Sequence, residues 1–273
     1  MRLLGIDFTS QPRRGKPLTV ARARLEGDVV VVEGIDELVD FAAYETLLRA
    51  PGPWLAAVDH PFGLPADFVA ALGWPGDWPG CVAHVAELGR PAFREAVADF
   101  VAQRPAGAKY LRRRTDQRLP YAASPLNIVN PPVGLMFAEG APRLLAAGVA
   151  VLPCRPDGDP GRVVVEGYPA AVARALIGKR AYKDGNWRGG RARGELLDAL
   201  AGRVAGTYGV SVALPEPHRT NALLDGRGDL LDAVLCTVQA AWSARRPDGR
   251  HGIPPGVDPL EGWIVDPDAR LLG

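Results

Sequence analysis

Cysteine is scarce in this chain, and its three cysteines are far apart. Cys81, Cys154 and Cys236 form no CxxC pair and are odd in number. This pattern argues against a disulfide framework or a zinc site, so a reducing, cytoplasmic location is expected. No apolar run approaches the roughly 20 residues that a membrane-spanning helix needs. We therefore expect no membrane partner.

An excess of charge of either sign is also missing. The 32 Lys and Arg residues balance 31 Asp and Glu residues, which leaves a formal net charge of +1. Because no basic field covers the whole chain, nucleic-acid binding must come from local patches. The 273 residues and the hydrophobic share of 47% are typical of a soluble globular protein. We predict one domain over residues 1–273.

Short apolar runs predict the strands of a mixed α/β sheet. Residues 3–8 are followed by alternating runs at 19–25 and 29–32, joined by a short Gly/Asp turn. Such spacing predicts three antiparallel strands. Asp36 is then expected to cap a helix that runs to residue 49. Residues 54–58 are all apolar, and Asp59 ends the run. An apolar run without alternation is typical of a central strand that is covered on both faces.

Residues 66–148 depart from this pattern and are expected to form a large insertion of helices and loops. Within it, residues 105–133 are rich in proline and arginine, and such a long irregular stretch is more often a functional lid than a plain connection. The pattern predicts helices over 66–73, 82–104 and 134–148. After the insertion it predicts strands over 149–152 and 163–166, and then helices over 168–176, 194–206 and 229–244.

Acidic residues stand at three predicted strand ends and near the start of the last helix. They are Asp7, Asp59 and Glu166 at the strand ends, and Asp229 and Asp232 on the helix. If the first and fourth strands are parallel neighbours, Asp7 and Asp59 lie side by side, where like charges repel unless a proton or cation separates them. Magnesium prefers such an all-oxygen site. Two ions about 4 Å apart can activate water against a phosphodiester.

Each acid also has a purely structural explanation. Asp7 and Asp59 can accept hydrogen bonds from backbone amides in tight turns. Glu166 can stabilise the N-terminus of the helix that follows it. Asp229 is a natural N-cap, with Asp232 in the capping-box position. On a helical wheel Asp232 lies at the margin of the apolar stripe, whereas Asp229 points further out. The pattern therefore favours Asp232 over Asp229 as a metal ligand.

Six short phrases along the chain together resemble a known family. They are Gly5-Ile6-Asp7-Phe8-Thr9-Ser10, Asp59-His60-Pro61-Phe62-Gly63-Leu64-Pro65, Ser124-Pro125-Leu126, Pro132-Val133-Gly134-Leu135-Met136-Phe137, Glu166-Gly167-Tyr168-Pro169-Ala170 and Asp229-Leu230-Leu231-Asp232-Ala233. In this order they resemble domain-of-unknown-function family 429, whose members are described as predicted nucleases of the ribonuclease H-like superfamily. The resemblance covers nearly the whole chain. It implies a ribonuclease H-like fold and a metal-dependent nuclease.

Basic and polar residues beside the acids are candidates for substrate contact. Arginines are dense within residues 109–118, and a second basic stretch covers 179–193 with Trp187 inside it. A charge run is usually a solvated surface, but arginine can also grip phosphate, and tryptophan can stack on a base. A histidine in a turn is often structural. The predicted substrate-binding residues are Thr9, Ser10, His60, Arg112, Arg114 and Lys183.

These observations leave three functions open. The leading hypothesis is a metal-dependent phosphodiester hydrolase that acts on DNA or RNA, in which Asp7, Asp59, Glu166 and Asp232 hold Mg²⁺ or Mn²⁺. The second is a non-catalytic metal- or nucleic-acid-binding protein, favoured by the near-neutral charge. The third is an actin-like phosphotransferase, whose fold begins similarly but doubles the unit that this chain shows once.

Overall fold

The computed structural model describes residues 1–119 and 121–269, and its centre is a mixed sheet. The strands are β1 (Arg2–Asp7), β2 (Leu18–Glu26), β3 (Val29–Leu38), β4 (Trp54–Asp59), β5 (Val149–Leu152), β6 (Asp159–Glu166) and β7 (Ser211–Ala213). Their order across the sheet is β5-β6-β4-β1-β2-β3-β7. The first three strands are antiparallel neighbours, whereas β1, β4, β6 and β5 run parallel. The predicted α/β class and the antiparallel-then-parallel sheet are confirmed.

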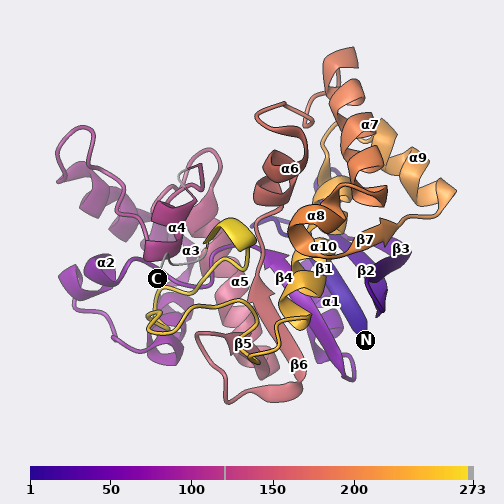
Figure 1. The fold of residues 1–273 in the computed structure, drawn as a ribbon. Coiled ribbons are helices and arrows are strands. Elements are labelled where there is room, and N and C mark those ends of the chain that lie inside the picture. Colours follow the sequence, from indigo (N-terminus) through magenta and orange to yellow (C-terminus); the bar gives the residue numbers. More distant parts are fainter. Residues whose placement is uncertain (120, 270–273) are drawn as a thin grey trace.

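Strands β1 and β4 lie side by side at the centre of this sheet (Figure 1). They pair in parallel, and their register places Asp7 opposite Asp59. The five residues Trp54 to Val58 of β4 are all buried, because helices cover both faces of the sheet here. The prediction that Asp7 and Asp59 end neighbouring parallel strands is therefore confirmed.

Helices cover both faces of the sheet. They are α1 (Phe41–Arg49), α2 (Ala66–Ala71), α3 (Trp78–Ala102), α4 (Arg114–Arg118), α5 (Val133–Ala147), α6 (Pro169–Ile177), α7 (Trp187–Ala201), α8 (Val204–Tyr208), α9 (Glu216–Leu224) and α10 (Asp229–Ala244), with a 3-10 turn at Pro267–Ala269. The helices form two apolar clusters with the sheet. One cluster joins the sheet to α1, α2, α3 and α5, and the other joins it to α6, α7, α8 and α10. In Figure 1, α7, α8 and α9 gather near β3 and β7, whereas α2, α3 and α4 lie on the other side of the picture. In the described residues, no helix combines the length and apolar character needed to cross a membrane.

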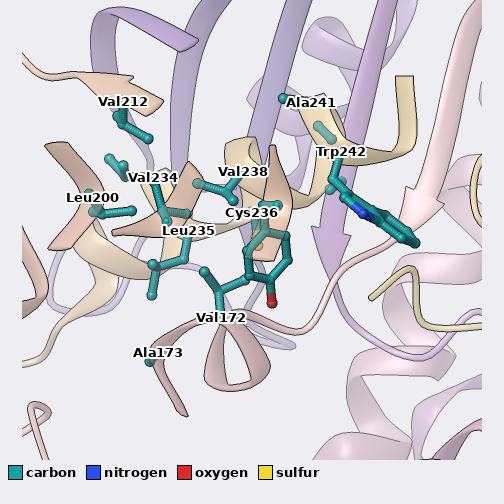
Figure 2. Packing of buried hydrophobic residues seen from close by; sticks show 14 of the residues in the cluster. Val172, Ala173, Leu200, Val212, Val234, Leu235, Cys236, Val238, Ala241 and Trp242 are labelled. Carbon is teal, nitrogen blue, oxygen red and sulfur yellow. The ribbon is translucent and has the colours of Figure 1, made fainter. Parts of the chain in front are cut away.

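Helix α10 packs directly on β1 because Gly5 has no side chain. A Cβ atom at Gly5 would lie only 2.0 Å from the carbonyl oxygen of Ala233. On its other side α10 buries Leu235 among side chains that include Val172 of α6 and Leu200 of α7 (Figure 2). This packing fixes the first turn of α10 beside the end of β1.

The prediction that Asp36 caps a helix is wrong. Asp36 lies in β3, where its carboxylate forms an ion pair with Arg22 at 2.6 Å. Strand β3 continues in register with β2 as far as Leu38. The cap of α1 is Asp40, whose side chain accepts a hydrogen bond from the amide of Ala43. An aspartate does cap α1, but it is Asp40 and not Asp36. Strand β3 extends further than its apolar residues 29–32 indicate.

The chain holds more regular structure in two predicted loops than its sequence indicates. Helix α7 begins at Trp187, inside the predicted basic loop, because Asn186 accepts hydrogen bonds from the first amides of the helix. The sequence pattern also gives no sign of β7, α8 or α9. The predicted lid, 105–133, contains helix α4, and its residue 120 lies outside the described residues. That residues 66–148 are an insertion stays a prediction.

Candidate metal centre

Three carboxylates meet where β1, β4 and α10 come together. Asp7, Asp59 and Asp232 each offer one carboxylate oxygen, and these three oxygens lie within 4.8 Å of one another. Asp7 and Asp59 are partly exposed, whereas Asp232 is buried. In the described part of the chain no other group of histidine, cysteine and acidic residues meets in this way. We call Asp7, Asp59 and Asp232 the carboxylate triad.

Burial and mutual repulsion make full ionisation of the carboxylate triad unfavourable. Burial first, and then the charge of Asp232, raise the pKa of Asp7 well above its usual range. The same two causes raise the pKa of Asp59 to about 7, although Lys183 opposes them. Burial also raises the pKa of Asp232, again against Lys183. A cation held between the oxygens would relieve this repulsion.

Lys183 and Tyr182 supply the polar contacts of Asp232. The ammonium group of Lys183 forms an ion pair with one oxygen of Asp232. The hydroxyl of Tyr182 donates a hydrogen bond of 2.6 Å to the other oxygen. Burial alone would lower the pKa of Lys183, but Asp232 and Asp7 raise it by more, so Lys183 is charged. One positive charge beside three carboxylates leaves the site negative, and its oxygen donors suit Mg²⁺ or Mn²⁺.

Glu166 ends β6, next to β4, but its carboxylate is engaged elsewhere. The two terminal nitrogens of Arg113 donate to it at 2.8 and 2.6 Å, and the amide of Phe62 donates at 2.9 Å. The same guanidinium donates to Asp116 at 2.8 Å. We call Arg113, Asp116 and Glu166 the Arg113 cluster, and all three side chains are buried. Glu166 as a catalytic metal ligand stays a prediction, with both of its oxygens already bonded to the protein.

Asp229 does not act as the N-cap of α10. The cap residue is Gly228, whose φ of 77° lies in the left-handed region that favours glycine, and Asp229 is the first helical residue. Its carboxylate lies 3.5 Å from the guanidinium of Arg227. The amide of Leu230 donates instead to the carboxylate of Asp225 at 3.1 Å. The predicted cap is therefore wrong by one residue. Asp229 lies outside the carboxylate triad, and its role as a metal ligand stays a prediction.

Thr9 and Ser10, which follow β1, are buried beside a cavity that is lined by basic side chains. This cavity has a volume of about 280 Å³, and four of its lining residues are basic: Arg13, Lys16, Arg90 and Arg94. Arg90 donates to the carbonyl oxygen of Ser10 at 2.8 Å and pairs with Glu139. In the described residues, the three other cations have no ion-pair partner. We call this the basic cavity.

His60 is buried and packs against aromatic rings, as a histidine with a structural role does. Its ring lies against Phe8 and Phe62, with ring centres 4.6 and 5.2 Å away. Its Nδ1 atom lies 2.8 Å from the carbonyl oxygen of Pro61. Burial lowers the pKa of His60 to about 4, so the ring is neutral near pH 7. Its role in substrate binding stays a prediction.

The arginine run at 112–114 divides into two kinds of residue. The guanidinium of Arg112 donates to three main-chain carbonyl oxygens of its own segment, those of Asp116, Leu119 and Ala122. Arg113 belongs to the Arg113 cluster. Arg114 is exposed, and its amide donates to the carboxylate of Glu261 at 2.8 Å. Two of the three arginines therefore hold the segment together, and only Arg114 faces solvent.

A cavity of about 350 Å³ opens beside the carboxylate triad. Asp59, Asp232 and Lys183 line one part of it, and the Arg113 cluster lines another. The remaining lining residues are mostly apolar and include Pro61, Ala122, Val133, Met136, Pro169 and Ala170. We call this the apolar cavity. It places an uncharged surface directly next to the acids.

Several residues of the site carry no signal in the sequence. Arg90 lies within a predicted helix and reaches Ser10 across 80 positions of the chain. In the sequence, Arg113 cannot be told apart from its neighbours Arg112 and Arg114, and only the fold brings it to Glu166. Tyr182 alone has an indication, since it precedes Lys183 in the basic stretch. Contacts between such distant positions depend on the tertiary fold and not on local pattern.

The comparison with protein-family models matches residues 5–258 to a family described as "Protein of unknown function (DUF429)". The chain belongs to this family. The match includes the whole carboxylate triad, the basic cavity, and every lining residue of the apolar cavity except Ile264. No curated protein and no solved structure matches the chain. The family description names no activity, so the function must be inferred from the site itself.

Proposed function

We propose that this member of the DUF429 family is a metal-dependent phosphodiester hydrolase, a nuclease of DNA or RNA. The observation that carries the proposal is the carboxylate triad, in which three acids share a small space with one lysine. A divalent ion such as Mg²⁺ or Mn²⁺ lowers the pKa of a bound water and neutralises charge that builds on a phosphodiester.

The protein's own residues have distinct roles in this proposal. Asp7 and Asp59, at adjacent strand ends, and Asp232, on α10, hold the ion through carboxylate oxygens. Tyr182 orients Asp232 by its hydrogen bond. Lys183 balances part of the negative charge when no ion is bound, and its side chain is 48% exposed. Displaced from Asp232, its ammonium group can contact a substrate phosphate.

The sheet supports the assignment of a ribonuclease H-like fold. Strands β3, β2 and β1 are antiparallel, and β4 and β6 follow in parallel on the other side of β1. The resemblance implies acids at the ends of the first and fourth strands and a third on the closing helix. The carboxylate triad has this composition. The fold assignment and the activity are thus supported by the same three residues.

The basic cavity supports an anionic substrate. Thr9 and Ser10, which follow Asp7 and Phe8 in the chain, line it together with four cationic side chains. Arginine and lysine beside a cavity bind phosphate oxygens through charge-assisted hydrogen bonds. In a chain of net charge +1, such a local concentration of positive charge is what phosphate binding requires. Arg13, Lys16 and Arg94 therefore join Thr9 and Ser10 as proposed substrate contacts.

The test is cleavage of DNA and RNA in the presence of Mn²⁺ by the wild-type protein and two variants. Asp59→Asn removes one charge from the carboxylate triad, and Asp99→Asn makes the same change on the exposed surface of α3. We expect the wild type and Asp99→Asn to cleave equally. Asp59→Asn should lose more than the roughly 10- to 100-fold typical of groups that only orient a ligand. Equal activity in both variants contradicts the proposal.

A second candidate function is metal or nucleic-acid binding without turnover on the same site. The contact between Lys183 and Asp232 favours it, because a lysine in the site satisfies part of the acidic charge. In that case Mn²⁺ still raises the melting temperature of the wild type and not of Asp59→Asn, but no nucleic acid is cleaved. Measuring melting temperature and cleavage on the same samples separates the two candidates.

A further inference from the structure

We propose that the apolar cavity holds one unpaired nucleoside of the substrate, so that the enzyme acts on single strands or strand ends. This inference rests on the proposed function, because it assigns the substrate of the same site. The apolar cavity begins at Asp59, Asp232 and Lys183, where the reacting phosphate would lie. A nucleoside that is attached to that phosphate can therefore reach into the apolar cavity.

The size of the apolar cavity limits its occupant to a small group. Its volume of about 350 Å³ is near the lower end of the roughly 300–1,000 Å³ range of small-molecule sites. Such a cavity accommodates one nucleoside and excludes a base pair with its two backbones. A base within a duplex can enter only after extrusion from its stack, which costs a few kcal/mol. An unpaired base enters without that cost.

The walls of the apolar cavity suit a flat, uncharged group. Val133 and Met136 from the start of α5 line one part, and Pro169 and Ala170 from the start of α6 line another. Extruded or unpaired bases are bound between apolar and aromatic side chains of this kind. Tyr168 also lines the cavity, and base–aromatic stacking is tolerant of base identity.

The polar groups inside the apolar cavity leave no open site for a second phosphate. Arg113 already donates to Asp116 and Glu166, and also to the carbonyl oxygen of Glu261. Two carboxylates against one guanidinium give this part of the cavity a negative charge. A phosphate would be repelled there, whereas an uncharged base would not.

The basic cavity lies on the other side of the segment 128–136. Pro131, Val133 and Met136 of this segment line the apolar cavity, while Pro132 and Leu135 line the basic cavity. The same segment therefore contributes to a site that suits apolar rings and to a separate site that suits phosphate. A nucleic-acid strand carries both kinds of group.

The binding test compares a nucleoside 5′-monophosphate with ribose 5-phosphate by calorimetry in the presence of Mn²⁺. Three proteins are used: the wild type, Ala170→Phe, which fills the apolar cavity, and Ala175→Phe, the same change on the exposed face of α6. We expect the wild type and Ala175→Phe to prefer the nucleotide about tenfold or more, the effect of one stacked base. Ala170→Phe should bind both ligands equally.

Two results would overturn the proposal. One is equal affinity of the wild type for the nucleotide and for ribose 5-phosphate, which decides the matter even if Ala170→Phe fails to fold. The other is an unchanged preference in folded Ala170→Phe. Val133→Phe fills the cavity from a different helix, α5, and should abolish the preference in the same way.

An activity test separates this proposal from the proposed function. A single strand and the same sequence in a blunt duplex are compared under the conditions that support cleavage. We expect the single strand to be cleaved at least about tenfold faster, because its bases are already unstacked. Equal rates on both substrates contradict the cavity assignment while the hydrolase stands. No cleavage of either, with nucleotide preference retained, contradicts the hydrolase while the cavity assignment stands.

Discussion

The carboxylate triad and the Arg113 cluster lie close together at the ends of neighbouring strands, but they balance their charge differently. In the Arg113 cluster one guanidinium makes hydrogen bonds to both carboxylates, and the whole group is buried. In the carboxylate triad three acids share one lysine that is half exposed. The first arrangement is complete within the protein. The second leaves an excess of negative charge, which a bound cation balances in our proposal.

This difference shows why an acid at a strand end is not by itself a ligand. Asp59 and Glu166 end adjacent strands and have similar surroundings in the sequence. Glu166 meets an arginine from the segment 105–133, whereas Asp59 meets two more acids. Their roles diverge because of the partner that the fold supplies. The following changes test that divergence, beginning with the largest effect.

Replacing the guanidinium of the Arg113 cluster should damage the fold more than any change in the carboxylate triad. Arg113→Met leaves Asp116 and Glu166 buried without a partner, and the expected loss is about 3–5 kcal/mol of unfolding free energy. Urea denaturation measures it. Arg114→Met, at the adjacent exposed position, is the control and should change the stability by less than about 0.5 kcal/mol. Similar values for both variants would show that the Arg113 cluster is not structural.

Removing a charge from the carboxylate triad should raise the unfolding free energy of the metal-free protein, whereas Arg113→Met lowers it. Burial and the neighbouring acids raise the pKa of Asp59 from 3.8 to about 7. The folded state therefore holds a proton that the unfolded state releases, and stability falls as the pH rises from about 4 to about 7. Asp59→Asn should remove about 2–4 kcal/mol of that fall.

Thermal unfolding across this pH range in the presence of a chelator measures the effect on Asp59. Saturating Mn²⁺ should flatten the pH dependence of the wild type, because the bound ion favours the ionised carboxylates. The variant should show little response to Mn²⁺. An identical pH dependence of the wild type and Asp59→Asn between pH 4 and 7 without metal would contradict the raised pKa of Asp59.

A smaller effect is expected from the lysine of the carboxylate triad. Lys183 competes with a divalent ion for Asp232, and its charge repels the ion. Lys183→Met should therefore tighten Mn²⁺ binding by about tenfold, or roughly 1.4 kcal/mol, as measured by calorimetry. Lys179→Met changes an exposed lysine of the same loop and should leave the affinity unchanged. Weaker binding in Lys183→Met would mean that the lysine supports the metal site.

The sequence predicts the central part of this site well, because strand ends have local signals. The apolar runs before Asp7 and Asp59 indicate strands, and parallel pairing then brings the two acids together, as β1 and β4 do. On a helical wheel Asp232 lies nearer the apolar face of α10 than Asp229 does. The structure places Asp232 in the carboxylate triad and Asp229 outside it. Periodicity is sufficient here because each residue's direction follows from its own element.

Contacts between distant segments could not be predicted in this way. The bond from Arg113 to Glu166 joins residues 53 positions apart, and nothing near Arg113 distinguishes it from Arg112 or Arg114. The boundary of β3 was misplaced for a related reason: its last residues, including Asp36, are polar, and only pairing with β2 keeps them in the sheet. Tertiary pairing overrides local composition at both places.

Diffraction from Mn²⁺-soaked crystals shows whether the carboxylate triad binds a divalent cation. An anomalous difference map at the manganese absorption edge locates the ion without reference to activity. We expect a peak within bonding distance of Asp7, Asp59 and Asp232, with Lys183 displaced from Asp232. A map with no peak at the carboxylate triad at saturating Mn²⁺, or with a peak only at the Arg113 cluster, would contradict it.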